Sequence, residues 1–161
     1  MTEQPDWLSN FVRIYNKLDK ETLHLLKEIY HPDIQFSDPL HGISGLQNLS
    51  TYFSDMYSNV ISCQFDIQHS LSQGDQAALY WTMHYRHKRL SKGREISVDG
   101  HSFLKVQDGK VIMHRDYFDA GSLLYEHIPV MGMGVRWLKS RISGEQSTSA
   151  DNGGEQACPK F

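Results

Sequence analysis

Four segments in which apolar and polar residues alternate constrain the fold of this chain more than any other feature. The alternation covers residues 61–71, 77–85, 96–106 and 111–118. A period of two is typical of strands that bury one face. Gly74-Asp75 separates the first two segments and Asp108-Gly109 the last two, and Asp-Gly favours a tight turn. The sequence therefore predicts a sheet of long antiparallel strands.

Helical spacing marks the part of the chain that precedes these strands. Apolar residues recur every three or four positions over residues 5–18, 23–29 and 46–56. His31-Pro32 ends the second helix, because proline disfavours helical geometry in the residue before it. Ser44 and Gln47 have the spacing of a capping box at the start of the third helix. Helices followed by strands predict an α+β domain with helices on one face of the sheet.

Composition narrows the class of protein. The chain has 161 residues and a formal net charge of -3, which argues against a nucleic-acid partner because such proteins need a dense basic surface. No apolar run approaches the roughly 18 residues that a spanning helix needs, so no membrane partner is expected. The polar first ten residues lack the pattern of an export signal, and two cysteines are too few for a disulfide framework. We expect a cytoplasmic protein.

The chain is expected to divide into a folded domain and two shorter parts. Residues 1–128 hold the helical and alternating patterns. Residues 129–142 contain a basic amphipathic stretch after Pro129, which predicts a helical extension. Residues 143–161 have almost no core-forming residues, so a disordered tail is expected there.

Polar residues on the last two strands are the first candidates for a functional site. Side chains two apart on a strand share a face, and two sets have this spacing: Asp99, His101 and Phe103, and His114, Asp116 and Phe118. We expect both sets to line one cavity, with Trp81 and Met83 as further walls. Carboxylates and imidazoles in an aromatic lining are suited to acid–base chemistry on a small apolar or aromatic ligand. The nine histidines have no metal-ligand spacing, so neither a metal nor a cofactor is predicted.

Two longer segments resemble a known superfamily. IQFSDPLHGISGLQNLSTYF and VDGHSFLKVQDGKVIMHRDYFD, after an N-terminal helix pair, are similar to the nuclear-transport-factor-2-like superfamily, in its SnoaL-like and ketosteroid-isomerase-like branch. The resemblance covers roughly residues 5–128. It implies a cystatin-like α+β roll, in which helices wrap a cone-shaped, mostly antiparallel sheet around an interior pocket. It also implies a homodimer formed through the outer sheet surface.

The resemblance also implies roles for particular residues. Asp38 matches the aspartate that shuttles the proton in steroid isomerases, and Tyr15 falls near the tyrosine that donates to the developing enolate. His101 occupies the place of the second oxyanion donor, which is an aspartic acid in those isomerases. Asp116 resembles in position the acidic residues that SnoaL-type polyketide cyclases and epoxide hydrolases carry on late strands. The implied activity is cofactor-independent isomerisation, cyclisation, dehydration or hydrolysis.

Several alternatives stay open on the sequence alone. Either Asp38 or Asp116 is the base, and Asp38 before Pro39 also suits a turn-capping role. A domain of this fold is alternatively a non-catalytic ligand-binding module or a dimeric scaffold. An enzyme predicts a cavity with Asp38 inside it, whereas a scaffold predicts a collapsed interior.

Overall fold

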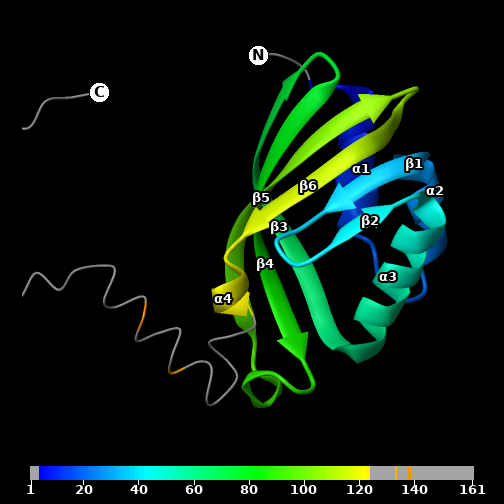
Figure 1. Cartoon of the computed structure of the whole chain (residues 1–161). Helices are drawn as coiled ribbons and strands as arrows, with labels where there is room; N and C mark the ends of the chain where they lie inside the picture. Colours follow the sequence, from blue (N-terminus) through cyan, green and yellow to red (C-terminus); the bar gives the residue numbers. More distant parts are fainter. Residues whose placement is uncertain (1–3, 124–132, 134–137, 139–161) are drawn as a thin grey trace, which may run out of the picture.

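A single curved sheet dominates the protein (Figure 1). The computed structural model describes residues 4–123 together with Met133 and Leu138. Six strands form the sheet: β1 (Tyr30–Ser37), β2 (Gly42–Ser44), β3 (Val60–Gln73), β4 (Gln76–His87), β5 (Ile96–Gln107) and β6 (Lys110–Phe118). Their order in space is β2-β1-β6-β5-β4-β3. Only β1 and β6 run parallel, so the predicted sheet of long antiparallel strands is confirmed.

Helices lie on the concave face of this sheet, except for one short turn, Ser91–Gly93, in the connection between β4 and β5. They are α1 (Asp6–Tyr15), η1 (Leu23–Leu25), α2 (Leu26–Ile29), α3 (Leu46–Asn59), η2 (Ser91–Gly93) and α4 (Ala120–Leu123). In Figure 1, α1 lies behind β6, and α3 packs against β1 and β2. The predicted α+β class, with helices on one face of a curved sheet, is confirmed. The predicted extension over residues 129–142 and the tail over 143–161 lie outside the described residues, apart from Met133 and Leu138.

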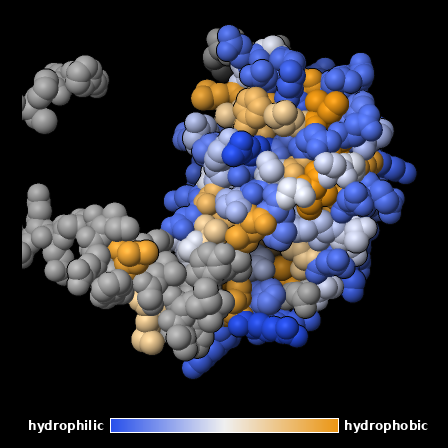
Figure 2. Space-filling view, in the orientation of Figure 1, coloured by the Kyte–Doolittle hydropathy of each residue, from blue (hydrophilic) through white to orange (hydrophobic). Residues whose placement is uncertain are grey.

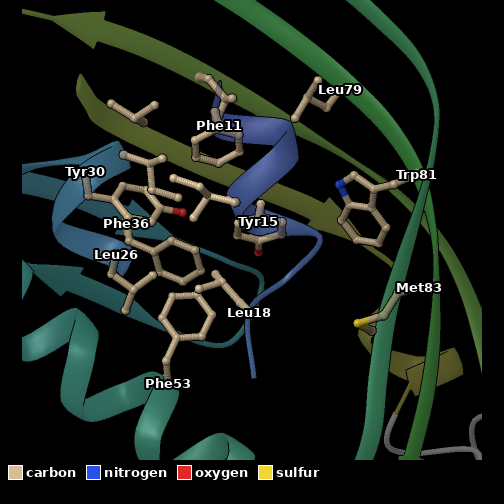
Figure 3. Packing of buried hydrophobic residues seen from close by; sticks show 14 of the residues in the cluster. Phe11, Tyr15, Leu18, Leu26, Tyr30, Phe36, Phe53, Leu79, Trp81 and Met83 are labelled. Carbon is tan, nitrogen blue, oxygen red and sulfur yellow. The ribbon is translucent and has the colours of Figure 1, made fainter. Parts of the chain in front are cut away.

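The core fills the space between the helices and the sheet (Figure 3). Phe11 of α1 stacks on Tyr15 at 5.2 Å between ring centroids and meets the edge of Tyr30 at 5.7 Å. Leu49 of α3 and Leu104 of β5 are fully buried. The aromatic part of this packing joins α1 to β1.

The segment between α2 and α3 needs one correction. Strand β1 begins at Tyr30, directly after α2, and Pro32 lies within a register shift between Tyr30 and Gln35. The capping box is wrong: the N-cap of α3 is Gly45, at a φ of 86° that favours glycine. Ser44 belongs to β2 and donates its hydroxyl to Gln35 Oε1 at 2.6 Å.

The register between β5 and β6 decides which side chains face the cavity. Asp108 and Gly109 form the predicted tight turn, with φ angles of 52° and 77°. Continued without interruption from that turn, the pairing would set His101 opposite Asp116. A register shift between Lys105 and Val106 instead pairs Ser102 with Asp116 and His101 with Tyr117. Because one residue of slip reverses the faces, the expectation that both candidate sets share one face is wrong.

Candidate functional site

A cavity of about 400 Å³ lies between the concave sheet face and the helices. It is bordered by side chains from α1, α3 and α4 and from every strand except β2 and β5. Its walls are mainly aromatic: Tyr15, Phe36, Tyr52, Phe53, Phe65, Trp81, Tyr85 and Phe118. Figure 3 shows Tyr15, Trp81 and Met83 pointing toward the same interior space. The cavity is large enough for a small aromatic molecule and is not filled by its own lining.

Trp81 reaches across the sheet because its neighbour on β5 has no side chain. Gly100 pairs with Trp81, and a Cβ added at Gly100 would overlap the indole ring. The ring therefore lies flat over β5, in edge contact with Phe65 at 5.2 Å between centroids. This glycine is needed for close approach of a side chain and not for an unusual backbone angle.

Asp116 lies at the centre of a buried hydrogen-bonded network. Trp81 Nε1 donates to Ser102 Oγ at 2.9 Å, and Ser102 Oγ donates to Asp116 Oδ1 at 2.5 Å. His114 Nε2 lies 2.8 Å from the same oxygen, and Tyr30 Oη lies 2.6 Å from His114 Nδ1. Ser102 and His114 are almost completely buried. The network fixes one carboxylate oxygen from two directions.

The proton positions in this hydrogen-bonded network follow from the two donors at its ends, Trp81 and Tyr30. An indole nitrogen only donates, so Ser102 accepts from Trp81 and passes its own proton to Asp116. Burial holds the pKa of Tyr30 well above its usual value of 10.0, and the charge of Asp116 adds to the shift. Tyr30 therefore keeps its proton and donates it to His114 Nδ1, which leaves the Nε2 proton for Asp116.

Two polar side-chain atoms of the sequence-predicted lining residues have no hydrogen-bond partner in the described part of the chain. Asp116 Oδ2 and the Tyr15 hydroxyl make no hydrogen bond to the residues that the structure describes, yet neither atom is sealed from the cavity. Burial, followed by the charge of Asp116, raises the pKa of Tyr15 well above 10.0. The cavity thus presents an acceptor and a proton-bearing donor to whatever enters it.

Asp38 lines the cavity and also caps a turn, so the two readings of this residue are compatible. Its Oδ1 accepts from the backbone nitrogens of Leu40 and His41, both at 2.7 Å. Its Oδ2 accepts from the Tyr52 hydroxyl at 3.0 Å, and His41 Nδ1 lies 3.2 Å from both oxygens. Leu40 and His41 are exposed and also border the cavity. Asp38 therefore lies near the mouth, with both oxygens engaged.

The structure divides the sequence-predicted residues between two faces of the sheet. Those that line the cavity are Tyr15, Asp38, Trp81, Met83, Asp116 and Phe118. His114 is fully buried behind Asp116. Asp99, His101 and Phe103 lie outside the lining, on the outer face, because of the register shift. There His101 stacks on Tyr117 and Tyr80, at 4.7 and 5.5 Å between centroids, and Asp99 accepts from Thr82 Oγ1.

Sequence reasoning missed several residues that complete the site. Ser102 is a polar residue on the otherwise apolar buried face of β5, between Val98 and Leu104. A polar residue at a buried position of the alternation was the sequence signal that could have identified it. Tyr52 and Phe65 had the spacing of ordinary core residues. Cys63 also lines the cavity, and burial raises the pKa of its thiol to about 12. It therefore behaves there as a small apolar side chain.

Neither a metal centre nor a membrane span is found in the described part of the chain. Over residues 4–123, no group of three or more histidine, cysteine, aspartate or glutamate side chains is arranged to hold a metal ion. No described helix has the length and hydropathy to cross a bilayer.

Comparison with protein families places this fold and cavity in a known group. The family model of the SnoaL-like domain matches residues 10–114. The chain belongs to the SnoaL-like domain family. No curated protein matches the chain. The match begins within α1 and ends within β6, so it covers α3 and five complete strands around the cavity of this SnoaL-like domain.

Solved structures share the fold of this SnoaL-like domain at low sequence identity. A protein from Shewanella putrefaciens CN-32, described as a SnoaL-like polyketide cyclase, has a TM-score of 0.67 and 17% identity, over 80% of this chain and 99% of its own. An NTF2-like protein of unknown function from Burkholderia pseudomallei K96243 has a TM-score of 0.67 and 11% identity, over 75% and 96%. A Catenulispora acidiphila DSM 44928 protein with a ketosteroid isomerase-like fold, in complex with trimethylamine, has a TM-score of 0.64 and 14% identity, over 76% and 92%.

Proposed function

We propose that this SnoaL-like domain binds a small, largely aromatic or apolar molecule in its cavity and transforms it by acid–base catalysis without a cofactor. One observation carries the proposal: Asp116 Oδ2 and the Tyr15 hydroxyl, an acceptor and a donor, have no hydrogen-bond partner among the described residues and border the same aromatic cavity. Buried polar groups are normally hydrogen-bonded, so these two atoms are suited to the polar groups of a ligand.

In this proposal Asp116 is the base. Hydrogen bonds from Ser102 and His114 hold Oδ1, which orients Oδ2 toward the cavity. Oδ2 takes a proton from a C–H group next to a carbonyl, and the electron pair of that bond moves onto the carbonyl oxygen. The Tyr15 phenol donates a hydrogen bond to this oxygen as negative charge develops on it. Return of the proton to another carbon completes an isomerisation.

Asp38 is assigned a binding role in this proposal. Both of its oxygens already accept hydrogen bonds, from two backbone nitrogens and from Tyr52. Asp116 has one oxygen that accepts no hydrogen bond from the described residues, whereas each oxygen of Asp38 accepts at least one, so Asp116 is the better placed base. Asp38 and Tyr52 would therefore shape the mouth of the cavity and contact the part of the ligand that lies nearest to solvent.

The outer sheet face supports a second copy of the chain as a partner. Tyr80, Met113 and Tyr117 are each 40 to 42% exposed there, and apolar patches interrupt the polar surface in Figure 2. Apolar side chains on the face opposite the core favour a protein partner. We include a homodimer through this face in the proposal.

A binding screen tests the proposal. We expect neutral aromatic or alicyclic ketones and phenols to raise the melting temperature, because a ligand at 100 times its Kd adds about 2.7 kcal/mol. The solved neighbour with trimethylamine supports the choice of small molecules as probes. Tyr15→Phe should weaken ketone binding up to about tenfold, the value of one neutral hydrogen bond. Hits that bind Tyr15→Phe and the parent equally would place the ligand elsewhere.

A further inference from the structure

The charged groups around the cavity are nearly all of one sign. Asp38, Asp55 and Asp116 line it, and none of the lining residues that the structure describes is a lysine or an arginine. His41 is the one histidine among the described lining residues, and its Nδ1 lies 3.2 Å from both oxygens of Asp38. His114 is buried behind Asp116 and reaches only Oδ1, so no described lining residue places a cationic side chain beside Asp116 Oδ2.

The other ionisable side chains of the lining are neutral. Burial raises the pKa of Cys63 and that of Tyr85 to about 12. Burial also raises the pKa values of Tyr15 and Tyr52 above 10.0, and in each case a neighbouring aspartate adds to the shift. At neutral pH these four groups add hydrogen-bond donors to the cavity and no charge.

One of the carboxylates is itself a feature that points to a ligand. The Asp116 side chain is 9% exposed, and its Oδ2 has no partner in the described part of the chain, although the atom opens into the cavity. A buried carboxylate oxygen needs a donor or a positive charge. The neighbouring walls are aromatic rings, including Trp81 and Phe118, and aromatic rings attract cations through their electron-rich faces.

We propose that the molecule taken by this cavity carries a positively charged nitrogen, either a protonated amine or a quaternary ammonium group, on an apolar body. This inference rests on the proposed function and names the ligand class for the same site. The cationic nitrogen lies on the Asp116 side of the cavity, next to the C–H group whose proton Oδ2 takes, so the carboxylate attracts the positive charge while Oδ2 itself stays free to act as the base. A carboxylate or phosphate ligand is disfavoured, because it would be buried beside like charges and would find no lysine or arginine among the described lining residues.

Three probes of nearly the same shape separate charge from hydrophobicity. Benzyltrimethylammonium is cationic, neopentylbenzene is its neutral carbon isostere, and phenylmethanesulfonate is an anion of similar size. Titration calorimetry on the full chain at neutral pH gives the three affinities. We expect the cation to bind about tenfold or more tightly than the neutral isostere, as a desolvated cation–π and charge contact allows. No binding of the anion is expected.

Variants test whether the preference for the cation over its neutral isostere arises in the cavity. Asp116→Asn keeps an oxygen for Ser102 and His114 but removes the charge, and should abolish most of the difference between cation and isostere. Asp38→Asn keeps the turn-capping oxygen and gives a second test if the first variant does not fold. Asp99→Asn is the matched control, because Asp99 lies outside the lining and loses the same unit of charge. It should keep the parent's preference.

Each outcome decides a different point. Equal affinity for cation and isostere, or a preference for the anion, overturns the cationic ligand class. Loss of the preference in Asp99→Asn as well would show that it reflects net charge and not the cavity, which also overturns it. If none of the three probes binds but the neutral phenol 2-naphthol does, the inference fails and the proposed function stands. If 2-naphthol fails too, both fall.

Discussion

Ser102 of β5 faces Asp116 of β6, and its hydroxyl donates to Asp116 Oδ1 at the centre of a buried polar chain. Trp81, which forms part of the cavity wall, donates to the same hydroxyl, so Ser102 links the indole ring to the Asp116 carboxylate. The proposed base is therefore held in place by the residue that also anchors the indole ring. The contact exists only because β5 and β6 pair one residue out of the register that their turn would give.

Removal of the Ser102 hydroxyl should destabilise the protein. Ser102→Ala leaves the buried Trp81 nitrogen without an acceptor and Asp116 with one donor fewer, so a loss of about 1–3 kcal/mol is expected. Urea unfolding measures it. Ser97→Ala is the control, because Ser97 lies on the exposed face of the same strand and bonds only to His84 there. Equal losses in the two variants would contradict the role given to the buried chain.

A methyl group at position 100 should disturb the cavity wall. Gly100→Ala places a Cβ in the space of the Trp81 indole, so the ring must move, at a cost of about 1–3 kcal/mol for overpacking. We expect lower stability and weaker binding of any ligand that binds in the cavity. Gly42→Ala is the matched control, since a Cβ there has nothing within 4 Å. Unchanged stability of Gly100→Ala would contradict the packing of Trp81.

Stability should fall as the pH rises above 9, in part through Cys63. Burial raises the pKa of this thiol from 9.0 to about 12 in the folded state. Between these values the unfolded chain loses a proton that the folded chain keeps, so rising pH favours unfolding. One such group accounts for at most about 1.4 kcal/mol per pH unit.

Comparison with a variant isolates this thiol, because the buried tyrosines, whose ordinary pKa is 10.0, contribute to the loss of stability in both proteins. Urea unfolding at pH 9 and 10 should show a smaller loss of stability in Cys63→Ala than in the parent. Identical losses in the two proteins would show that the thiol is not shielded from water.

The outer sheet face should mediate self-association. Tyr80→Glu adds a charge to the exposed aromatic patch and should convert a dimer to a monomer in sedimentation velocity. Ser54→Glu adds the same charge to an exposed position of α3 and should leave the dimer intact. A parent protein that sediments as a monomer at all concentrations would contradict the proposed homodimer.

Much of the fold could be predicted from the sequence because its signals are local. Alternation over the four strands and the Asp108-Gly109 turn depend only on neighbouring residues, and the structure has them as predicted. It was harder to predict which face of the sheet each side chain occupies. The register shift between Lys105 and Val106 places His101 on the face opposite Asp116. Neither residue is of a type that would predict a bulge from the sequence.

The candidate site was predictable only where a face could be inferred from its own strand. Trp81 and Met83 lie in a strand whose alternation is regular, and both line the cavity. Ser102 and Tyr52 depend on contacts between distant segments, so no local pattern marked them. Gly100 likewise acquires its role only through Trp81 on the neighbouring strand.

The most direct test of the account is proton exchange on a ketone bound in the cavity. In D₂O, the parent protein should exchange the proton next to the carbonyl of a ketone hit into solvent, as followed by NMR. Asp116→Asn should lose that exchange by at least about a hundredfold, the usual contribution of a general base, while it still binds the ketone. Asp99→Asn should exchange at the parent's rate. Exchange that persists in Asp116→Asn, or a parent that binds ketones without exchange, would contradict the account.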